Sequence, residues 1–525
     1  MQWWRTAVVY QVWPRSFADS DGDGIGDLRG VIGRLDHLAD LGVDALWLSP
    51  VYPSPQVDAG YDVSDYRGVD PLFGSLEDLD GLIAGLHARG MRLVLDMVLN
   101  HTSDHHPWFV QSRSSRDNPK RDWYVWRDTP PNSWPSLFGG PAWQHEEATG
   151  QSYLHTFAVE QPDLNWENAQ VRAALADMLR WWLDRGVDGF RFDVISMVSK
   201  DFQDPVGFLG FGPDLHPHLQ ELHREVLAGR DLMTVGETPM ASIEQARLMT
   251  EPERGELDMV FGFEHVSLDQ GRGKWDHVPL PLPVLKRSFA AWQAGIGDGW
   301  NSLYWDNHDQ PRAVSRFGDD GEHRVASAKT LATVLHLHRG TPFVYQGEEL
   351  GMANARLALQ DYRDLESLNF YAEAVARGTT PADALAALQR TSRDNARTPM
   401  QWDGTANAGF TTGTPWIPLA HGQGDVTVAS QRDDPDSVLS HYRRLIRLRH
   451  EVPAVAHGDF ALRLEDDEQV WAFTRRHEGV ELLVVASFSP YELTPELDLA
   501  GELLLGTHPD PGPVLRPWES RVLRR

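Results

Sequence analysis

The chain has 525 residues, 41% hydrophobic and 24% charged, a composition typical of a globular protein with a large core. Its 48 basic and 76 acidic residues give a net charge of −28, which disfavours a nucleic-acid partner. Cysteine is absent, which excludes disulfides, thiolate catalysis and cysteine-ligated zinc. Because there is no apolar run of about 18 residues and no signal-like N-terminus, we expect a cytoplasmic protein without a membrane span.

Short apolar runs alternate with amphipathic segments through most of the chain. This alternation predicts parallel strands joined by crossover helices. Since the strand count approaches eight, we expect an α/β fold of the (β/α)₈ TIM barrel type. The expected strands are Ala7–Pro14, Asp44–Ser49, Arg92–Val98, Asp188–Asp193, Leu232–Glu237, Leu303–Asp306 and Pro342–Gln346, and the clearest helices are Val31–Leu41, Leu79–Arg89 and Val171–Arg185.

Three stretches interrupt this alternation. Residues 101–167, after the third strand, are rich in Trp, Pro, Ser and Asn and predict an inserted, loop-rich subdomain. Further insertions follow the fourth and eighth strands, at about 200–217 and 351–413. After residue 453, short apolar runs at 460–464, 470–475 and 481–487 predict a C-terminal antiparallel β domain. We therefore expect a barrel of residues 1–100 and 168–453, a subdomain of 101–167 and a β domain of 454–525.

Ionisable side chains recur where the expected strands end. They are Asp96 and His101, Arg191 and Asp193, Glu237, and His308 and Asp309. A single acid at a strand end is usually a helix cap or a surface residue. Several such groups at one rim of a barrel instead indicate an active site.

Paired carboxylates without cysteine or a histidine-rich metal motif favour glycosidic chemistry. One carboxylate attacks the anomeric carbon, and the other protonates the leaving oxygen and later activates water. Arg191 lies two residues before Asp193, so both side chains point to one face of their strand, and the arginine can keep the carboxylate ionised. Spacing alone does not assign the individual roles.

Five short motifs follow one another in a specific order: DMVLNH at 96–101, QPDLNW at 161–166, GFRFDVIS at 189–196, TVGET at 234–238 and WDNHDQPR at 305–312. With them the chain resembles the α-amylase family of glycoside hydrolases over essentially its whole length. The resemblance implies that Asp193 is the nucleophile, Glu237 the general acid/base and Asp309 the transition-state stabiliser. It also implies that His101, Arg191 and His308 line the site of the sugar that is released.

The same resemblance implies a group that grips the non-reducing end of the substrate. Asp62 and Tyr66, in GYDVSDY, match that segment, with an arginine of RDNARTPMQW as partner. The choice between Arg393 and Arg397 stays open. An aspartate–arginine pair that closes this end of the site implies that the enzyme acts from the chain end.

Within the family, four further motifs are similar to the branch of oligo-1,6-glucosidases, dextran glucosidases and α-glucosidases: YQVWPRSF, GDGIGDLRG, YQGEELGM and ARTPMQWD. In that branch, valine directly after the nucleophile accompanies α-1,6 linkages, whereas alanine or threonine accompanies α-1,4 linkages. The chain has Val194 there, which favours α-1,6. The alternative interpretation is that Val194 is only a β-former near a strand end.

A loop with alternating oxygen donors comes early in the chain. Asp19, Asp21, Asp23, Ile25 and Asp27 alternate with small residues, a pattern that suits a hard cation such as Ca²⁺. The twelfth position is glycine rather than glutamate, so the loop is not an EF-hand. The matching loop of the oligo-1,6-glucosidase branch binds Ca²⁺ or Mg²⁺, with the Ile25 position contributing its carbonyl. We expect a structural role; the alternative is a turn without metal.

Together these features predict a retaining, exo-acting α-glucosidase for short oligosaccharides, with structural Ca²⁺ or Mg²⁺, no organic cofactor, and a monomeric or weakly associated state. The alternatives are an α-1,4-preferring α-glucosidase, or a transglucosidase or isomerase of the trehalose synthase or sucrose isomerase type. The RLDRF-type segment associated with sucrose isomerases is not found after Asp309. A non-catalytic transporter subunit is disfavoured, since all three acids are present. Lys274 and Trp275 are candidates to contact a sugar beyond the scissile bond.

Overall fold

Eight parallel strands form the centre of the molecule. The computed structural model describes residues 2–420, 424, 426–508 and 510–525. The strand order is β10-β11-β1-β2-β3-β7-β8-β9, and a parallel bridge between Val260 and Asn301 joins its two ends, so the (β/α)₈ barrel is confirmed. The strands are β1 Val9–Val12, β2 Ala45–Leu48, β3 Arg92–Val98, β7 Gly189–Asp193, β8 Met233–Thr238, β9 Met259–Gly262, β10 Ser302–Leu303 and β11 Thr341–Tyr345.

Alternating residues of the barrel strands pack into two different hydrophobic clusters. In β2, Ala45 and Trp47 belong to the cluster inside the barrel, whereas Leu46 and Leu48 belong to the larger cluster beneath the helices. This two-residue period explains why the strands are buried on both sides and read as continuous apolar runs.

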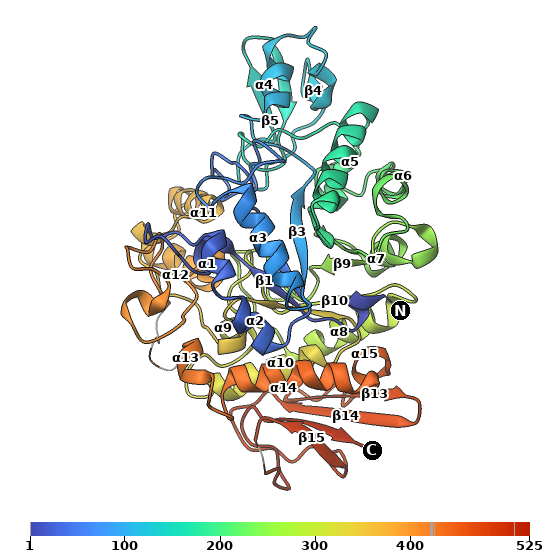
Figure 1. Ribbon diagram of the computed structural model, residues 1–525, viewed down its shortest axis with the longest axis vertical. Helices are drawn as coiled ribbons and strands as arrows, with labels where there is room; N and C mark the ends of the chain where they lie inside the picture. Colours follow the sequence, from blue (N-terminus) through green and yellow to red (C-terminus); the bar gives the residue numbers. More distant parts are fainter. Residues whose placement is uncertain (1, 421–423, 425, 509) are drawn as a thin grey trace.

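Helices surround the barrel (Figure 1). The expected single helix over 31–41 is instead two: α1 ends at Ile32 and α2 begins at Leu35, because Arg34 between them has non-helical backbone angles. The end at Gly42 is as expected, with a left-handed φ of 91°. The main helices are α1 Leu28–Ile32, α2 Leu35–Leu41, α3 Leu76–His87, α5 Ala169–Asp184, α6 Leu215–Leu222, α7 Ile243–Thr250, α8 Leu282–Gly295, α9 Ala313–Phe317, α10 Arg324–His336, α13 Val428–Gln431, α14 Val438–Glu451 and α15 Pro453–His457.

The segment after β3 stands at one end of the molecule and the C-terminal sheet at the other (Figure 1). The first contains α4 Pro107–Ser114 and a small antiparallel sheet of β4 Trp126–Arg127, β6 Gln151–Leu154 and β5 Trp143–Glu146. The C-terminal sheet is antiparallel in the order β12-β13-β14-β16-β15. Its strands are β12 Asp459–Arg463, β13 Val470–His477, β14 Val480–Ser487, β15 Glu502–Gly506 and β16 Ser520–Arg524.

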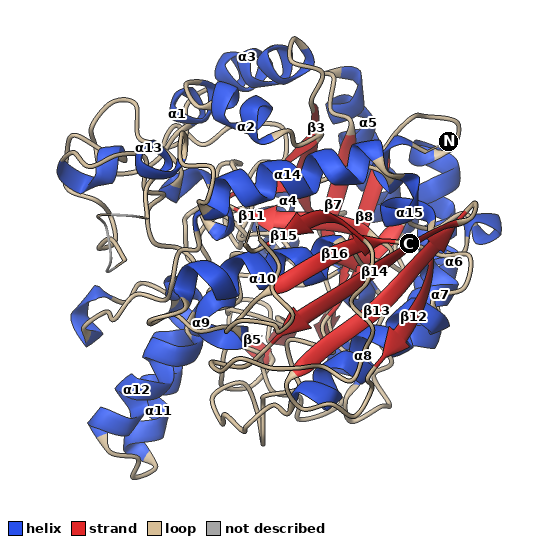
Figure 2. Cartoon of the chain, turned by 90° about the horizontal axis from the view of Figure 1, so that it is seen from below, coloured by secondary structure: helices blue, strands red, loops and turns tan. Residues whose placement is uncertain are grey.

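Two features outside the barrel were not predicted from the sequence. The sequence indicated three C-terminal strands, and the structure adds β15 and β16, which the long connection between them had obscured. The insertion after β11 contains a helical hairpin, α11 Leu365–Ala376 and α12 Pro381–Thr391, which projects from the barrel (Figure 2). The domain limits themselves stay predictions. Among the described residues, no helix combines the length and the apolar character needed to cross a bilayer.

Candidate active site

One guanidinium holds three carboxylates at the carboxyl ends of β3, β7 and β8. Arg191 Nη1 donates to Asp96 at 2.8 Å and to Asp193 at 2.7 Å. Its Nη2 donates to Glu237 at 2.6 Å. All four side chains are buried. The predicted common face of Arg191 and Asp193 is therefore present, and the two expected catalytic carboxylates meet at this arginine.

The cluster holds more acids than cations. Burial raises the pKa of Asp193, and repulsion from Glu237 and Asp96 adds to this, while Arg191 opposes it. Burial also disfavours the charged form of Arg191, but Asp96 and Glu237 outweigh it and raise the pKa of the guanidinium. The contact with Arg191 therefore does not by itself keep Asp193 ionised, as the sequence led us to expect, because burial and the two neighbouring acids outweigh it. One ionised and one protonated carboxyl is the state that glycoside cleavage requires.

The residue after Asp193 has an unusual backbone. Val194 has φ 36° and ψ 41°, a left-handed conformation that a β-branched residue rarely adopts. This conformation lets its backbone N–H donate to Glu237 Oε2 at 3.1 Å. Val194 also lines the cavity above the carboxylates. It therefore both holds Glu237 and contributes to the wall of the site.

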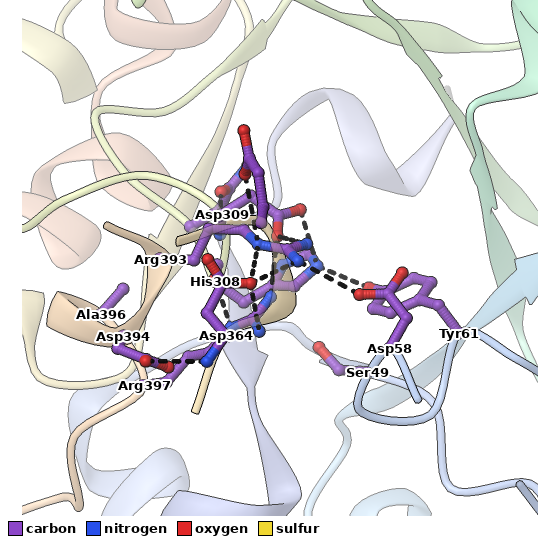
Figure 3. Close-up of polar contacts among 12 residues, drawn as sticks. Ser49, Asp58, Tyr61, His308, Asp309, Asp364, Arg393, Asp394, Ala396 and Arg397 are labelled. Carbon is purple, nitrogen blue, oxygen red and sulfur yellow. Dashed lines mark hydrogen bonds and ion pairs between the residues drawn. The ribbon is translucent and has the colours of Figure 1, made fainter. Parts of the chain in front are cut away.

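A second group of charges surrounds Asp309 (Figure 3). One carboxylate oxygen lies 3.0 Å from His308 Nε2. The other accepts from Arg393 at 3.2 Å and from Arg397 at 3.0 Å. Burial alone would raise the pKa of Asp309, but His308 and the two arginines outweigh it and hold the pKa well below its usual range. These neighbours thus favour the ionised form of Asp309.

Aromatic rings fix the imidazole of His308. It stacks on the ring of Trp13, with ring centroids 5.2 Å apart, and on the ring of Tyr61, with ring centroids 5.3 Å apart. Gln11 Nε2 lies 2.8 Å from Nδ1. Because an amide nitrogen only donates, Nδ1 accepts this bond, and Nε2 is left as the donor that faces Asp309.

Asp58, not Asp62, makes the ion pair expected in this region. Arg393 Nη2 donates to Asp58 at 3.2 Å (Figure 3). Asp62 is fully buried and accepts from the backbone N–H groups of Val57 and Asp58, so it holds the loop that carries Asp58. Between them the chain reverses at Ala59, whose φ is 50°. The motif match could not reveal which aspartate this turn presents to the site.

Tyr61 similarly takes the place expected for Tyr66. The Tyr66 hydroxyl donates to the backbone carbonyls of Val98, at 2.7 Å, and His101, at 3.1 Å, which places it below the site. Tyr61 lines the cavity and contacts Asp96 and His308. Both arginines contact Asp309, but Arg393 lines the cavity and pairs with Asp58, whereas Arg397 lies over Trp13.

These groups open into a cavity of about 310 Å³. It contains His101, whose pKa burial lowers to about 4, so the imidazole is neutral above that pH. At the other side, Lys274 Nζ lies 2.5 Å from Glu366, which α11 supplies. Several further residues that line the cavity were not predicted from the sequence. Tyr61 lies within the GYDVSDY motif but was not singled out, and Glu366 lies on a helix of an insertion; the others are Asp58, Phe138, Phe157, Met240 and Gln270.

The expected metal loop brings only part of its ligand set together. Carboxylate oxygens of Asp19, Asp21 and Asp27 lie within 4.8 Å of one another, a donor set that fits a hard cation. The Asp23 carboxylate instead accepts from the Ile25 backbone N–H at 2.8 Å. The loop packs against the segment 410–416: Gly24 has φ 95°, and a Cβ there would lie 1.9 Å from the Thr414 carbonyl oxygen.

The fold and this arrangement of acids define a carbohydrate-active barrel enzyme. The family model described as "Alpha amylase, catalytic domain" matches residues 11–458. The chain belongs to the α-amylase family, and it is a glycoside hydrolase.

Similar proteins cover the chain from end to end. It is 50% identical to an oligo-1,6-glucosidase of Halalkalibacterium halodurans, over 99% of this chain and 98% of that protein. Among solved structures, trehalose-6-phosphate hydrolase of Bacillus licheniformis superimposes with a TM-score of 0.95 at 42% identity, over 100% of both chains. Trehalulose synthase of Pseudomonas mesoacidophila does so with a TM-score of 0.96 at 44% identity, over 100% of this chain and 99% of that one.

Proposed function

We propose that the protein is a retaining, exo-acting α-glucosidase that releases glucose from α-1,6-linked oligosaccharides. The observation that carries the proposal is the Arg191 guanidinium that bridges Asp193 and Glu237 at the bottom of a cavity that also presents the Asp58–Arg393 pair. The oligo-1,6-glucosidase relative supports the α-1,6 linkage.

The mechanism follows from these positions. A carboxylate oxygen of Asp193 attacks the anomeric carbon while Glu237 gives its proton to the glycosidic oxygen, whose bond to that carbon breaks. Glu237 then takes a proton from water, and the water oxygen displaces Asp193 and frees glucose. Asp309, held ionised by its basic neighbours, binds sugar hydroxyls and stabilises the positive charge that develops in both steps.

The charges of the cavity favour a neutral sugar over a phosphorylated one. Its lining carries five carboxylates, from Asp58, Asp193, Glu237, Asp309 and Glu366. The two cations of the lining, Lys274 and Arg393, are already paired with acids. A phosphate dianion would enter a site with an excess of negative charge, so we place the substrate among neutral glucosides.

The first test compares initial rates on isomaltose, maltose, trehalose and sucrose, with the products separated by chromatography. Free glucose from isomaltose at the highest rate is the expected result. Faster cleavage of maltose would overturn the α-1,6 assignment and leave hydrolysis intact. New disaccharides in place of glucose would instead identify a transferase or isomerase, the activity type that the name of the trehalulose synthase relative indicates.

Val194→Ala is expected to shift the linkage preference. The smaller side chain removes two methyl groups from the cavity wall and leaves the backbone N–H that Glu237 accepts from. The ratio of kcat/KM for isomaltose over maltose should fall about tenfold, the size of effect that one or two methyl groups produce in a pocket. Val198→Ala, buried four residues further along, is the matched control for loss of apolar volume. An unchanged ratio would contradict the role of Val194.

Substrate binding should weaken in mild acid. Burial raises the pKa of Asp58 to about 6. As pH falls through 6, Asp58 is protonated and loses its ion pair with Arg393, so we expect KM for isomaltose to rise below pH 6 and to be constant above it. In Asp58→Asn, KM should be high and independent of pH over this range. A wild-type KM that is flat from pH 7 to pH 5 would contradict the prediction.

We propose that Asp19, Asp21 and Asp27 hold a structural Ca²⁺ or Mg²⁺, with Asp23 and the Ile25 carbonyl completing the set. Without a cation, three carboxylates repel one another across the loop, and a ligand that binds only the folded state stabilises it. EDTA should therefore lower Tm by a few degrees, and added Ca²⁺ should restore it. Asp21→Asn should weaken both responses. An unchanged Tm in a sample shown to be metal-free would refute the site. The cytoplasmic location and the monomeric or weakly associated state stay predictions.

A further inference from the structure

Three buried carboxyl groups lie close together near the loop of Asp309. Asp306 follows β10, three residues before Asp309, and Glu348 and Glu349 begin the short 3₁₀ helix Glu348–Leu350 after β11. Their exposed fractions are 2%, 7% and 0%. Gly347, directly before the glutamates, has φ 90°, so the turn that leads both of them into the interior needs the left-handed backbone that glycine adopts without strain.

Glu349 has donors for both of its oxygens. Oε1 accepts from the Tyr10 hydroxyl at 2.8 Å and lies 3.2 Å from His37 Nε2, while Oε2 accepts from the backbone N–H of Gly347 at 2.8 Å. His37 Nδ1 is buried and has no partner among the described residues, so a second N–H there would be an unsatisfied donor. The neutral imidazole with its proton on Nε2 therefore suits this place, and Glu349 accepts as a carboxylate.

The other two carboxyl groups each have one satisfied oxygen and one that is not. Asp306 Oδ2 accepts from the backbone N–H of Ala313 at 2.8 Å, and Glu348 Oε1 accepts from the Tyr442 hydroxyl at 2.6 Å. Asp306 Oδ1 and Glu348 Oε2 are buried, and no N–H or hydroxyl in the described part of the chain donates to them. The two carboxyl groups are within hydrogen-bonding reach of each other. Two carboxylates cannot form such a bond, whereas one proton between these oxygens satisfies both.

The balance of charge also favours one retained proton. The cation near these acids is Arg312, which is fully buried and donates to the carbonyls of Gln346, at 2.6 Å, and Ala396, at 3.0 Å. Burial raises the pKa of Glu348 well above its usual range, and Asp306 raises it further. Burial also raises the pKa of Asp306, but Arg312 and the hydrogen bond with Glu348 oppose this. The proton therefore resides on Glu348 and is donated to Asp306.

The other titratable side chains around the pair stay uncharged. Burial raises the pKa of three phenols, those of Tyr10, Tyr345 and Tyr442. Tyr442 belongs to α14, which lies between the barrel and the C-terminal sheet (Figure 1). His336 lies edge-on to Tyr442, with ring centroids 5.5 Å apart, and burial lowers its pKa to about 3. A change of charge here at neutral or mildly alkaline pH therefore belongs to the carboxyl pair.

This pair is tied to the loop that carries Asp309. The bond from Ala313 to Asp306 joins the two ends of that loop. Arg312, from the same loop, donates to the carbonyl of the residue before Arg397, and Arg397 donates to Asp309 at 3.0 Å. A displacement of Asp306 thus moves Asp309 together with one of the arginines that favour its ionised form.

We propose that Asp306 and Glu348 share one proton, and that this buried pair positions the loop of His308 and Asp309 for catalysis. Glu348 donates and Asp306 accepts, so both are positioning residues that act through Asp309. The proposal rests on the glycoside hydrolase activity and not on the α-1,6 linkage, so failure of the linkage assignment leaves it intact.

Infrared spectroscopy and urea unfolding test for the proton. At pH 7, the spectrum of the wild type minus that of Glu348→Gln should contain the C=O band of a protonated carboxyl group. Because the pKa of Glu348 is raised in the folded state, its stabilising effect is greatest at low pH and is lost as pH rises. The unfolding constant of the wild type relative to that of Glu348→Gln should therefore rise about tenfold per pH unit above about pH 6, until the pair loses its proton.

Glu519→Gln is the matched control, because Glu519 is fully buried but pairs with a cation, Arg521, at 2.7 Å. This variant should give neither the band nor the pH-dependent ratio. A missing band for Glu348→Gln, or a ratio of unfolding constants that does not change with pH, would overturn the shared proton.

Steady-state kinetics well below Tm tests the positioning, with the glucoside that the wild type cleaves fastest. In Glu348→Gln the amide N–H can donate to Asp306 and the amide oxygen can accept from Tyr442, so kcat should stay within about threefold of the wild type. In Glu348→Ala, Asp306 loses its donor, and kcat should fall about 10- to 100-fold with a smaller change in KM, the scale of a misplaced catalytic group.

A folded Glu348→Ala with the kcat of the wild type would overturn the positioning role, since a merely structural pair would affect Tm alone. An equal loss of kcat in Glu348→Gln would do the same. Should Glu348→Ala fail to fold, Asp306→Asn gives the answer: its amide can donate to Glu348, so kcat should be retained, and a loss of about tenfold or more would overturn the proposal.

Discussion

Asp193→Ala should abolish hydrolysis of isomaltose, with a loss of at least about 10⁴-fold in kcat, the scale seen when the nucleophile is removed from other covalent enzymes. Without this carboxylate, no glucosyl-enzyme can form on the β face of the sugar, opposite the leaving group. Arg191 keeps Asp96 and Glu237 as partners, so the cluster retains its cation and its remaining hydrogen bonds. We therefore expect the variant to fold, with a Tm close to that of the wild type.

Chemical rescue makes this prediction specific. Azide can enter the space that Asp193 leaves and attack the anomeric carbon of p-nitrophenyl α-glucoside from the same side. The product should be β-glucosyl azide, with inverted configuration, identified by nuclear magnetic resonance. Asp184→Ala, an exposed residue at the end of α5, controls for loss of an aspartate. Residual hydrolysis above one per cent of wild type, or an α-azide product, would show that another residue is the nucleophile.

Glu237→Gln should lower kcat on isomaltose by about 10²- to 10⁴-fold, the contribution of a positioned general acid or base. The glutamine oxygen can still accept from Arg191 and from the Val194 N–H, so the site keeps its shape and its affinity for sugar. The loss should be largest for natural glucosides, whose leaving group needs a proton, and smaller for aryl glucosides, whose leaving group does not.

Azide again distinguishes the role. In this variant the glucosyl-enzyme still forms from an activated aryl glucoside and awaits a nucleophile that needs no base. Azide should therefore accelerate turnover and give α-glucosyl azide, with retained configuration. Glu478→Gln, in the β13–β14 turn far from the cavity lining, is the control. Near-wild-type turnover of isomaltose by Glu237→Gln would refute the assignment of the acid/base.

Much of this architecture is already present in the order of residues. The alternation of short apolar runs with amphipathic helices predicts the barrel, since parallel strands must be joined by crossovers that return to the same edge. Acids at strand ends then predict the site, because the carboxyl ends of all eight strands meet at one rim. Asp193 with Arg191, and Glu237, could be placed in this way, since each lies on a strand and the strand sets its direction.

What lies on loops was decided by the tertiary structure alone. Asp58 rather than Asp62 faces Arg393, because the reversal at Ala59 turns one aspartate into the site and the other onto its own backbone. Glu366 reaches the cavity from a hairpin in an insertion far along the chain. By itself the sequence determined the barrel and the residues on its strands, because a short apolar run between two amphipathic helices defines a strand locally. It did not determine the loop and insertion residues that complete the site. Their positions depend on contacts between segments that lie far apart in the chain, and no local sequence pattern indicates such contacts.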